Sequence, residues 1–143
     1  RIIAGGTGTF PVYAAIDDSV LELSPGTNTF FDAGYGELYP DLDYVPALRI
    51  LTRVISRPTH ETLTLDLGYK ACASDPALSK RLAFPSLTGP EVILQNEEHL
   101  VLQTLDAHRY QPGDTLLAIP GHVCPTSALH KEALVIDDGD DIT

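Results

Sequence analysis

The chain has 143 residues, of which 43% are hydrophobic and 20% are charged, enough for about one folded domain. Its 9 Lys and Arg against 20 Asp and Glu give a net charge of −11, and the sequence shows no basic patch, which argues against binding to nucleic acid or to an anionic membrane. No apolar run approaches the roughly 18 residues that span a bilayer. The chain has only two cysteines, Cys72 and Cys124, whereas small secreted domains that depend on disulfide bonds usually have more. We therefore expect a cytoplasmic protein. The chain lacks Met and opens with Arg1, so we expect it to be a piece of a longer polypeptide.

The first nine residues combine a short apolar run with a glycine-rich turn. Residues 1–4 (RIIA) are typical of a buried strand, and Gly5, Gly6 and Thr7 begin the turn. Glycine lets the backbone bend sharply and approach a ligand, so the turn can direct N–H groups at an anion. A helix predicted over residues 10–16, with Thr9 as its N-cap, would favour the same anion. An ordinary connection after a strand is the alternative, because such glycine turns are common.

Beyond residue 19, short alternating segments are separated by turn residues about every ten positions, which is typical of an all-β barrel or sandwich. We predict strands over residues 20–23, 27–32, 47–56, 61–67, 91–94, 99–105, 115–119 and 133–137. The glycines and prolines of residues 34–46 predict a loop with three tyrosines, and one helical turn is expected over residues 75–80. Asp66 and Lys70 bracket a glycine turn, across which we expect a salt bridge.

The most informative local string is His122-Val123-Cys124-Pro125, which follows the predicted strand that ends near Pro120. In an extended backbone, residues two apart point to one side, so His122 and Cys124 would project together. An imidazole nitrogen and a thiolate suit zinc, and two protein ligands leave positions open for water or substrate. Ordinary packing of both side chains is the alternative, because the spacing alone does not separate the two interpretations.

Seven strings occur in the order found in the D-threonine aldolase / D-serine dehydratase family, and the chain resembles the C-terminal region of these enzymes over nearly its whole length. They are residues 22–27 (ELSPGT), 30–32 (FFD), 54–58 (VISRP), 66–71 (DLGYKA), 97–99 (EEH), 112–114 (PGD) and, most specific, 122–126 (HVCPT). The resemblance implies pyridoxal-phosphate enzymes of alanine-racemase-like architecture, in which an N-terminal (β/α)8 barrel carries the cofactor on a Schiff-base lysine and a β-domain follows.

The resemblance also assigns parts to this chain. Residues 1–19 correspond to the end of the barrel, with Gly5, Gly6 and Thr7 in the loop that holds the cofactor phosphate, and residues 20–143 to the C-terminal β-domain. His122 and Cys124 match the metal-ligand pair. Zinc suits such a pair; aldolase members often carry His-x-Asp and use manganese, so Cys124 favours the dehydratase side. The implied partners are a small D-amino acid substrate, the missing barrel and a second copy in a homodimer.

The implied activity is a metal-dependent lyase reaction on β-hydroxy D-amino acids, in which the metal activates the substrate's β-hydroxyl. A dehydratase would give a 2-oxo acid and ammonia, and an aldolase would give glycine and an aldehyde. Ser24 and Asn28 replace the Arg and Tyr common in the family, which leaves the substrate open. Lys70 does not match the Schiff-base lysine, so we expect no catalytic residue in this chain and no activity from it alone. The alternatives are a non-catalytic β-domain for dimerisation or as a lid, and a metal-free racemase-like enzyme.

Overall fold

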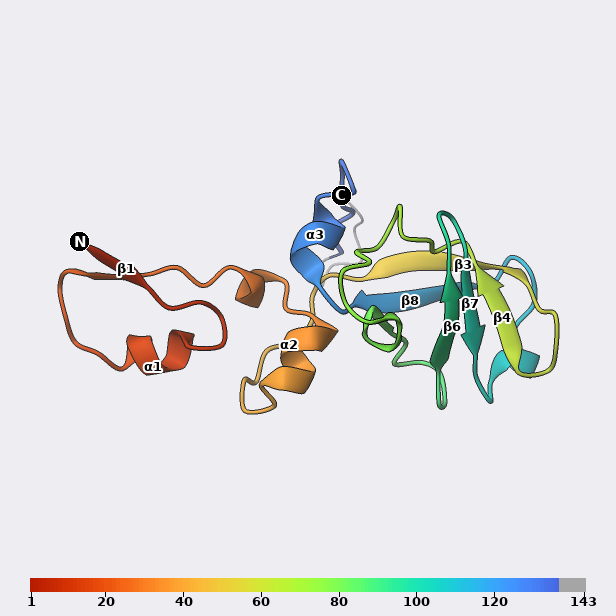
Figure 1. The fold of residues 1–143 in the computed structure, drawn as a ribbon, viewed down its shortest axis with the longest axis horizontal. Coiled ribbons are helices and arrows are strands. Elements are labelled where there is room, and N and C mark those ends of the chain that lie inside the picture. The colour runs from red at the N-terminus through yellow and green to blue at the C-terminus, as the bar shows by residue number, and fades with distance from the viewer. Residues whose placement is uncertain (137–143) are drawn as a thin grey trace.

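The computed structural model describes residues 1–136 and shows an elongated molecule with a small N-terminal part at one end and a six-stranded sheet at the other (Figure 1). The N-terminal part contains β1 (Ile2–Ala4), α1 (Phe10–Ala14), β2 (Leu21–Leu23), the 3₁₀ helix η1 (Thr27–Thr29) and α2 (Ala33–Leu38). The sheet part contains β3 (Ile50–Ser56), β4 (Thr62–Leu65), the 3₁₀ helix η2 (Leu78–Lys80), β5 (Leu82–Ala83), β6 (Glu91–Gln95), β7 (Leu100–Gln103), the 3₁₀ helix η3 (Ala107–Arg109), β8 (Thr115–Pro120) and α3 (Val123–Ser127).

The sheet has the strand order β5-β8-β3-β4-β7-β6, with antiparallel neighbours throughout. The predominantly β fold is confirmed, and the alternation of apolar side chains explains it. Leu63 and Leu65 of β4 are fully buried, and in β3 Val54 is buried while its neighbour Ile55 is exposed. The inward side chains form one core, so the sheet curves strongly, with β4, β6 and β7 crossing the direction of β3 and β8 (Figure 1).

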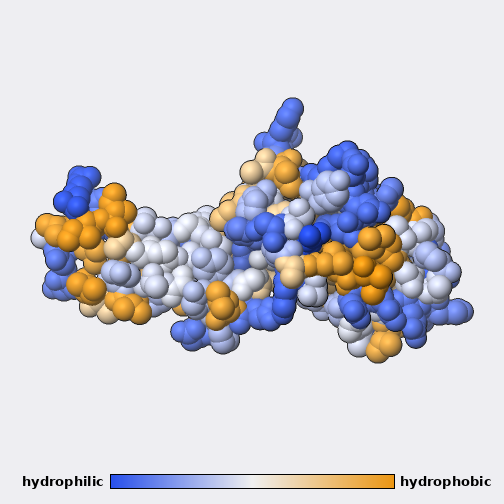
Figure 2. All heavy atoms as spheres, in the orientation of Figure 1, coloured by the Kyte–Doolittle hydropathy of each residue, from blue (hydrophilic) through white to orange (hydrophobic). Residues whose placement is uncertain are grey.

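The N-terminal part has a separate, much smaller sheet. β1 and β2 pair in parallel, with Ile2 opposite Leu21, and neither joins the six-stranded sheet. Its apolar side chains remain on the surface: Ile2 is 55% exposed and Ile3 is 69% exposed, and Figure 2 shows apolar atoms gathered at this end of the molecule. The pairing joins residues on both sides of residue 19, and the domain boundary there stays a prediction.

Two sequence-based expectations between the parts are wrong. The strand expected over residues 27–32 is the 3₁₀ helix η1 followed by Phe31 in the left-handed region at φ 51°. The loop expected over residues 34–46 contains α2, which begins because the side chain of Asp32 accepts a hydrogen bond from the Tyr35 N–H. Residues 133–135 are irregular instead of a strand, and the final residue of that predicted strand lies outside the described residues.

The salt bridge expected between Asp66 and Lys70 is also wrong. The Lys70 ammonium lies 2.7 Å from carboxylate oxygens of both Glu97 and Glu98. Asp66 instead accepts hydrogen bonds from the Thr52 hydroxyl and a β3 backbone N–H, so it joins β3 to the end of β4. Among the described residues, no helix is long and apolar enough to cross a lipid bilayer.

Candidate functional site

His122 and Cys124 lie where β8 gives way to α3. The chain leaves β8 through Gly121, where an added Cβ would lie 1.8 Å from the Lys80 carbonyl oxygen, so only glycine fits. His122 is the extended N-cap residue of α3, and Cys124 lies in the first turn of that helix. The expectation of a continuous extended segment is therefore wrong, because the Thr126 hydroxyl donates to the His122 carbonyl at 2.7 Å and closes the first turn.

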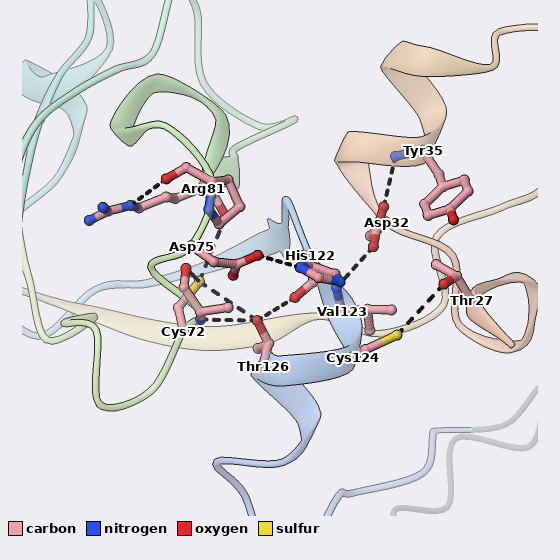
Figure 3. Close-up of polar contacts among 12 residues, drawn as sticks. Thr27, Asp32, Tyr35, Cys72, Asp75, Arg81, His122, Val123, Cys124 and Thr126 are labelled. Atoms are coloured by element: carbon pink, nitrogen blue, oxygen red, sulfur yellow. Dashed lines mark hydrogen bonds and ion pairs between the residues drawn. The ribbon is translucent and has the colours of Figure 1, made fainter.

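The two side chains are directed at different partners, as Figure 3 shows. The His122 Nδ1 lies 2.6 Å from the Asp75 Oδ2, and the Cys124 Sγ lies 3.6 Å from the Thr27 hydroxyl. Both residues nevertheless line one open hollow of about 430 Å³, to which Tyr69 and Asp75 also contribute. The hollow therefore has an imidazole and a thiol on its wall, each fixed by its own neighbour.

These donors suit a zinc ion by their chemistry. His122 uses Nδ1 for Asp75, which leaves Nε2 as the ring nitrogen without a hydrogen-bond partner among residues 1–136. Imidazole nitrogen and cysteine sulfur bind zinc well, whereas calcium and magnesium prefer oxygen ligands. Within the described part of the chain, no three His, Cys, Asp or Glu side chains are grouped to hold a metal ion. The hollow can thus supply two ligands, which leaves coordination positions for water or substrate.

Asp32 ties this motif to the N-terminal part. Its carboxylate is fully buried, and Oδ1 accepts from the Tyr35 N–H at 2.8 Å while Oδ2 accepts from the Val123 N–H at 2.9 Å. One side chain therefore caps the N-termini of both α2 and α3, and satisfies two backbone donors that helix starts leave unpaired. The position of the His122 to Cys124 turn consequently depends on a residue about ninety positions earlier.

The glycine-rich turn lies in the N-terminal part. Gly5 has φ +83°, which an L-residue rarely adopts, and a side chain at Gly6 would meet open space. The N–H groups of Gly6, Thr7 and Gly8 donate no hydrogen bond to another described residue. The buried hydroxyl of Thr7 accepts from the Asn28 N–H at 3.1 Å. Free N–H groups in a tight turn form the kind of concavity that binds phosphate.

Asn28 carries an unpaired polar atom beside this turn. Its buried Oδ1 has no hydrogen-bond partner among the described residues. A buried unpaired acceptor costs about 1–3 kcal/mol, so a donor from a ligand or from another polypeptide segment would stabilise this position. Asn28 is also one of the two positions at which the resemblance described above predicts a different residue.

Residues 27–34, which we call the bridging segment, contact both candidate sites. Asn28 bonds the glycine-rich turn, Thr27 contacts the Cys124 sulfur and Asp32 caps α3. Phe31, inside the segment, keeps its left-handed backbone while buried against Tyr44, with ring centroids 5.3 Å apart. Such a conformation persists only where the surroundings enforce it. The structure therefore links the predicted phosphate turn and the predicted metal ligands through one short segment.

Sequence reasoning missed Asp75, Asp32 and Thr27. Asp32 directly precedes α2 and is a favoured N-cap residue, so the sequence contained a signal for a helix start there. Gly34 and Gly36 have low helix propensity and favoured a loop instead. Asp75 precedes a proline in a turn, and nothing in the sequence brings it beside a histidine 47 positions later. Thr27 belongs to one of the strings that resemble the family, but nothing in the sequence indicated its contact with Cys124.

Residues 47–136 match a protein-family model described as "Putative serine dehydratase domain". D-threonine aldolase of Arthrobacter sp is 32% identical over 141 residues, which are 96% of this chain and 36% of that protein. The crystal structure of D-threonine aldolase from Filomicrobium marinum superposes with a TM-score of 0.82 at 25% identity, covering 99% of this chain and 38% of that one. The chain thus spans little more than a third of the length of these relatives.

D-threo-3-hydroxyaspartate dehydratase from Delftia sp. HT23 has the same fold, with a TM-score of 0.77 at 21% identity over 99% of this chain and 42% of that one. Structures of D-threo-3-hydroxyaspartate dehydratase variants also match. One has a cysteine replaced by alanine and is in the metal-free form, and another has a histidine two positions earlier replaced by alanine.

Proposed function

Since the chain belongs to the serine dehydratase domain family, we propose that it is the C-terminal part of a pyridoxal-phosphate- and divalent-metal-dependent lyase that acts on β-hydroxy D-amino acids. The observation that carries this proposal is the hollow lined by both His122 and Cys124. The variants of the matching dehydratase support it, because they replace a histidine and a cysteine with the same spacing, and the structure of the cysteine variant is described as a metal-free form. The complete protein is proposed to be a cytoplasmic homodimer.

In this proposal, His122 Nε2 and the Cys124 sulfur hold the cation, and zinc is preferred over manganese because thiolate is a soft ligand. When bound, pyridoxal phosphate withdraws electrons from the substrate α-carbon, and the cation polarises the substrate's β-hydroxyl. Gly6 and Thr7 would donate hydrogen bonds from their backbone N–H groups to the cofactor phosphate, and Gly5 would provide the sharp bend that directs them. The open side of the hollow admits a small amino acid.

Lys70 is unsuited to the role of the Schiff-base lysine. Hydrogen bonds to Glu97, and then to Glu98, raise its pKa above its usual value, so its amine stays protonated. A nucleophilic lysine needs the opposite, a lowered pKa in a desolvated pocket. The lysine that binds the cofactor is therefore proposed to come from the barrel, and these 143 residues alone are expected to show no turnover.

One observation favours a second function. The imidazole and the thiol point toward different partners, Asp75 and Thr27, as they would if both were packing residues. In that case the β-domain serves in dimerisation or as a lid and binds no metal.

The decisive experiment uses the complete protein that contains these residues, with bound metal counted by elemental analysis. The wild type, His122→Ala, Cys124→Ala and the control His60→Ala are assayed with D-serine and D-threonine, with and without a chelator, for 2-oxo acid against glycine. His60 is exposed and borders a different surface hollow. We expect metal and turnover to be lost in the two ligand variants and kept in the control. Undiminished metal and turnover in both ligand variants would reject the metal-ligand role of His122 and Cys124 and would favour the second function.

A further inference from the structure

Asp75 lies at the rim of the hollow with its carboxylate against His122. We propose that Asp75 is a positioning residue for metal binding: it fixes the hydrogen of the His122 ring on Nδ1 and so presents Nε2 as the metal donor. This inference rests on the proposed function, because it assigns a role toward the same cation. Asp75 acts through His122 and is not itself proposed as a ligand.

The chemistry of the pair determines the direction of the hydrogen bond. An ionised carboxylate only accepts hydrogen bonds, so at the 2.6 Å separation the His122 Nδ1 must carry the hydrogen and donate it to Oδ2. In a neutral imidazole, the other nitrogen then has the free lone pair. Nε2 is thus the nitrogen available to an ion. A carboxylate in this position also makes the imidazole a stronger donor, as in carboxylate–histidine–zinc arrangements.

The loop that carries Asp75 is held on both sides. On one side, the Ala73 N–H donates to the Thr126 hydroxyl at 3.1 Å, and Thr126 in turn donates to the His122 carbonyl. On the other side, the Arg81 Nε donates to the Pro76 carbonyl at 3.0 Å. The loop and the histidine therefore share Thr126 as a common anchor, which fixes the carboxylate relative to the ring (Figure 3).

Stability does not account for this arrangement. The side chains of His122 and Asp75 are 41% and 55% exposed, and ion pairs at such exposed positions contribute little to folding. The loop is already fixed by the backbone contacts of Ala73 and Pro76, without the carboxylate. The Asp75 carboxylate is therefore not needed to hold the loop in place. Its hydrogen bond to His122 is explained better by a role in orienting the ring toward a ligand in the hollow.

The test measures zinc affinity of the complete protein by competition with a chromophoric chelator, for wild type, Asp75→Ala, Asp75→Asn and Asp75→Glu. Asp43→Asn is the matched control, because Asp43 is exposed and lies outside the hollow. Asp75→Ala is expected to weaken zinc binding about 10- to 100-fold, the usual effect of removing such a partner. Asp75→Asn should weaken zinc binding less than Asp75→Ala does, since the amide oxygen can still accept a hydrogen bond from Nδ1. Asp75→Glu should retain the most zinc affinity of the three variants.

A second readout needs neither metal nor activity. Nitrogen NMR of the ¹⁵N-histidine-labelled, metal-free protein reports which ring nitrogen of His122 carries the hydrogen. We expect the Nδ1–H form in the wild type and a mixture in Asp75→Ala, at an unchanged melting temperature. An Nε2–H form in the wild type, or zinc affinity of Asp75→Ala within about twofold of wild type, would overturn the inference. His122→Ala separates the two proposals: if it keeps its zinc, the metal site itself is wrong, whereas if it loses zinc while Asp75→Ala does not, only the role of Asp75 is wrong.

Discussion

The two ends of the molecule use apolar residues in opposite ways. In the six-stranded sheet, alternate side chains such as Leu63, Leu65 and Leu100 are fully buried in one core. In the N-terminal part, Ile2 and Ile3 belong to a two-stranded sheet of three-residue strands and face outward. So short a sheet is not stable by itself in water. The sheet part can therefore supply its own folding energy, whereas the N-terminal part needs further packing contacts to be stable.

Core truncation should give the largest difference between the two ends. Leu63→Ala is expected to lower the free energy of unfolding by about 2–5 kcal/mol, because it leaves a cavity in a fully buried site. Ile3→Ala should change it by less than about 0.5 kcal/mol, since the side chain is already exposed. Urea unfolding of the 143-residue chain measures both. Equal losses would show that the N-terminal part is packed as firmly as the sheet.

Cys72 gives the stability of the sheet core a dependence on pH. Burial raises the pKa of the Cys72 thiol to about 11, whereas the same thiol ionises near pH 9 once unfolded. The contribution of this thiol to stability is therefore complete below about pH 9 and is lost as the pH rises toward 11, by at most about 2–3 kcal/mol. Urea unfolding at pH 8, 9, 10 and 11 should show this decline in the wild type and a shallower one in Cys72→Ala. Parallel declines in both proteins would contradict the prediction.

Asp32 tests the connection between the two ends, with a smaller expected effect. Asp32→Ala removes the acceptor for the Val123 and Tyr35 N–H groups, and should cost about 1–3 kcal/mol. Hydrogen exchange should accelerate most at the starts of α2 and α3. The control Asp43→Asn changes a charge in the same region and should leave both properties unchanged. A loss confined to α2 would show that α3 does not rely on this cap.

The sheet was largely predictable from the sequence, and the connection between the ends was not. Leu63 and Leu65 alternate with polar residues, so their strand and its buried face follow from local pattern alone. The start of α3 has no such local signal, because the group that caps it belongs to Asp32. His122 and Cys124 were identified as a pair by their string, but the geometry derived from an extended backbone was wrong, since a distant carboxylate and Thr126 turn that backbone into a helix.

The bridging segment, residues 27–34, touches the glycine-rich turn near its start and the cap of α3 near its end. The place proposed for the phosphate and the place proposed for the cation are therefore held by adjacent residues, because Asn28 contacts the turn and Thr27 contacts the Cys124 sulfur. We expect a single insertion or deletion between Asn28 and Asp32 to be tolerated less than an exchange of side chains there, because it would shift the turn contact against the cap of α3.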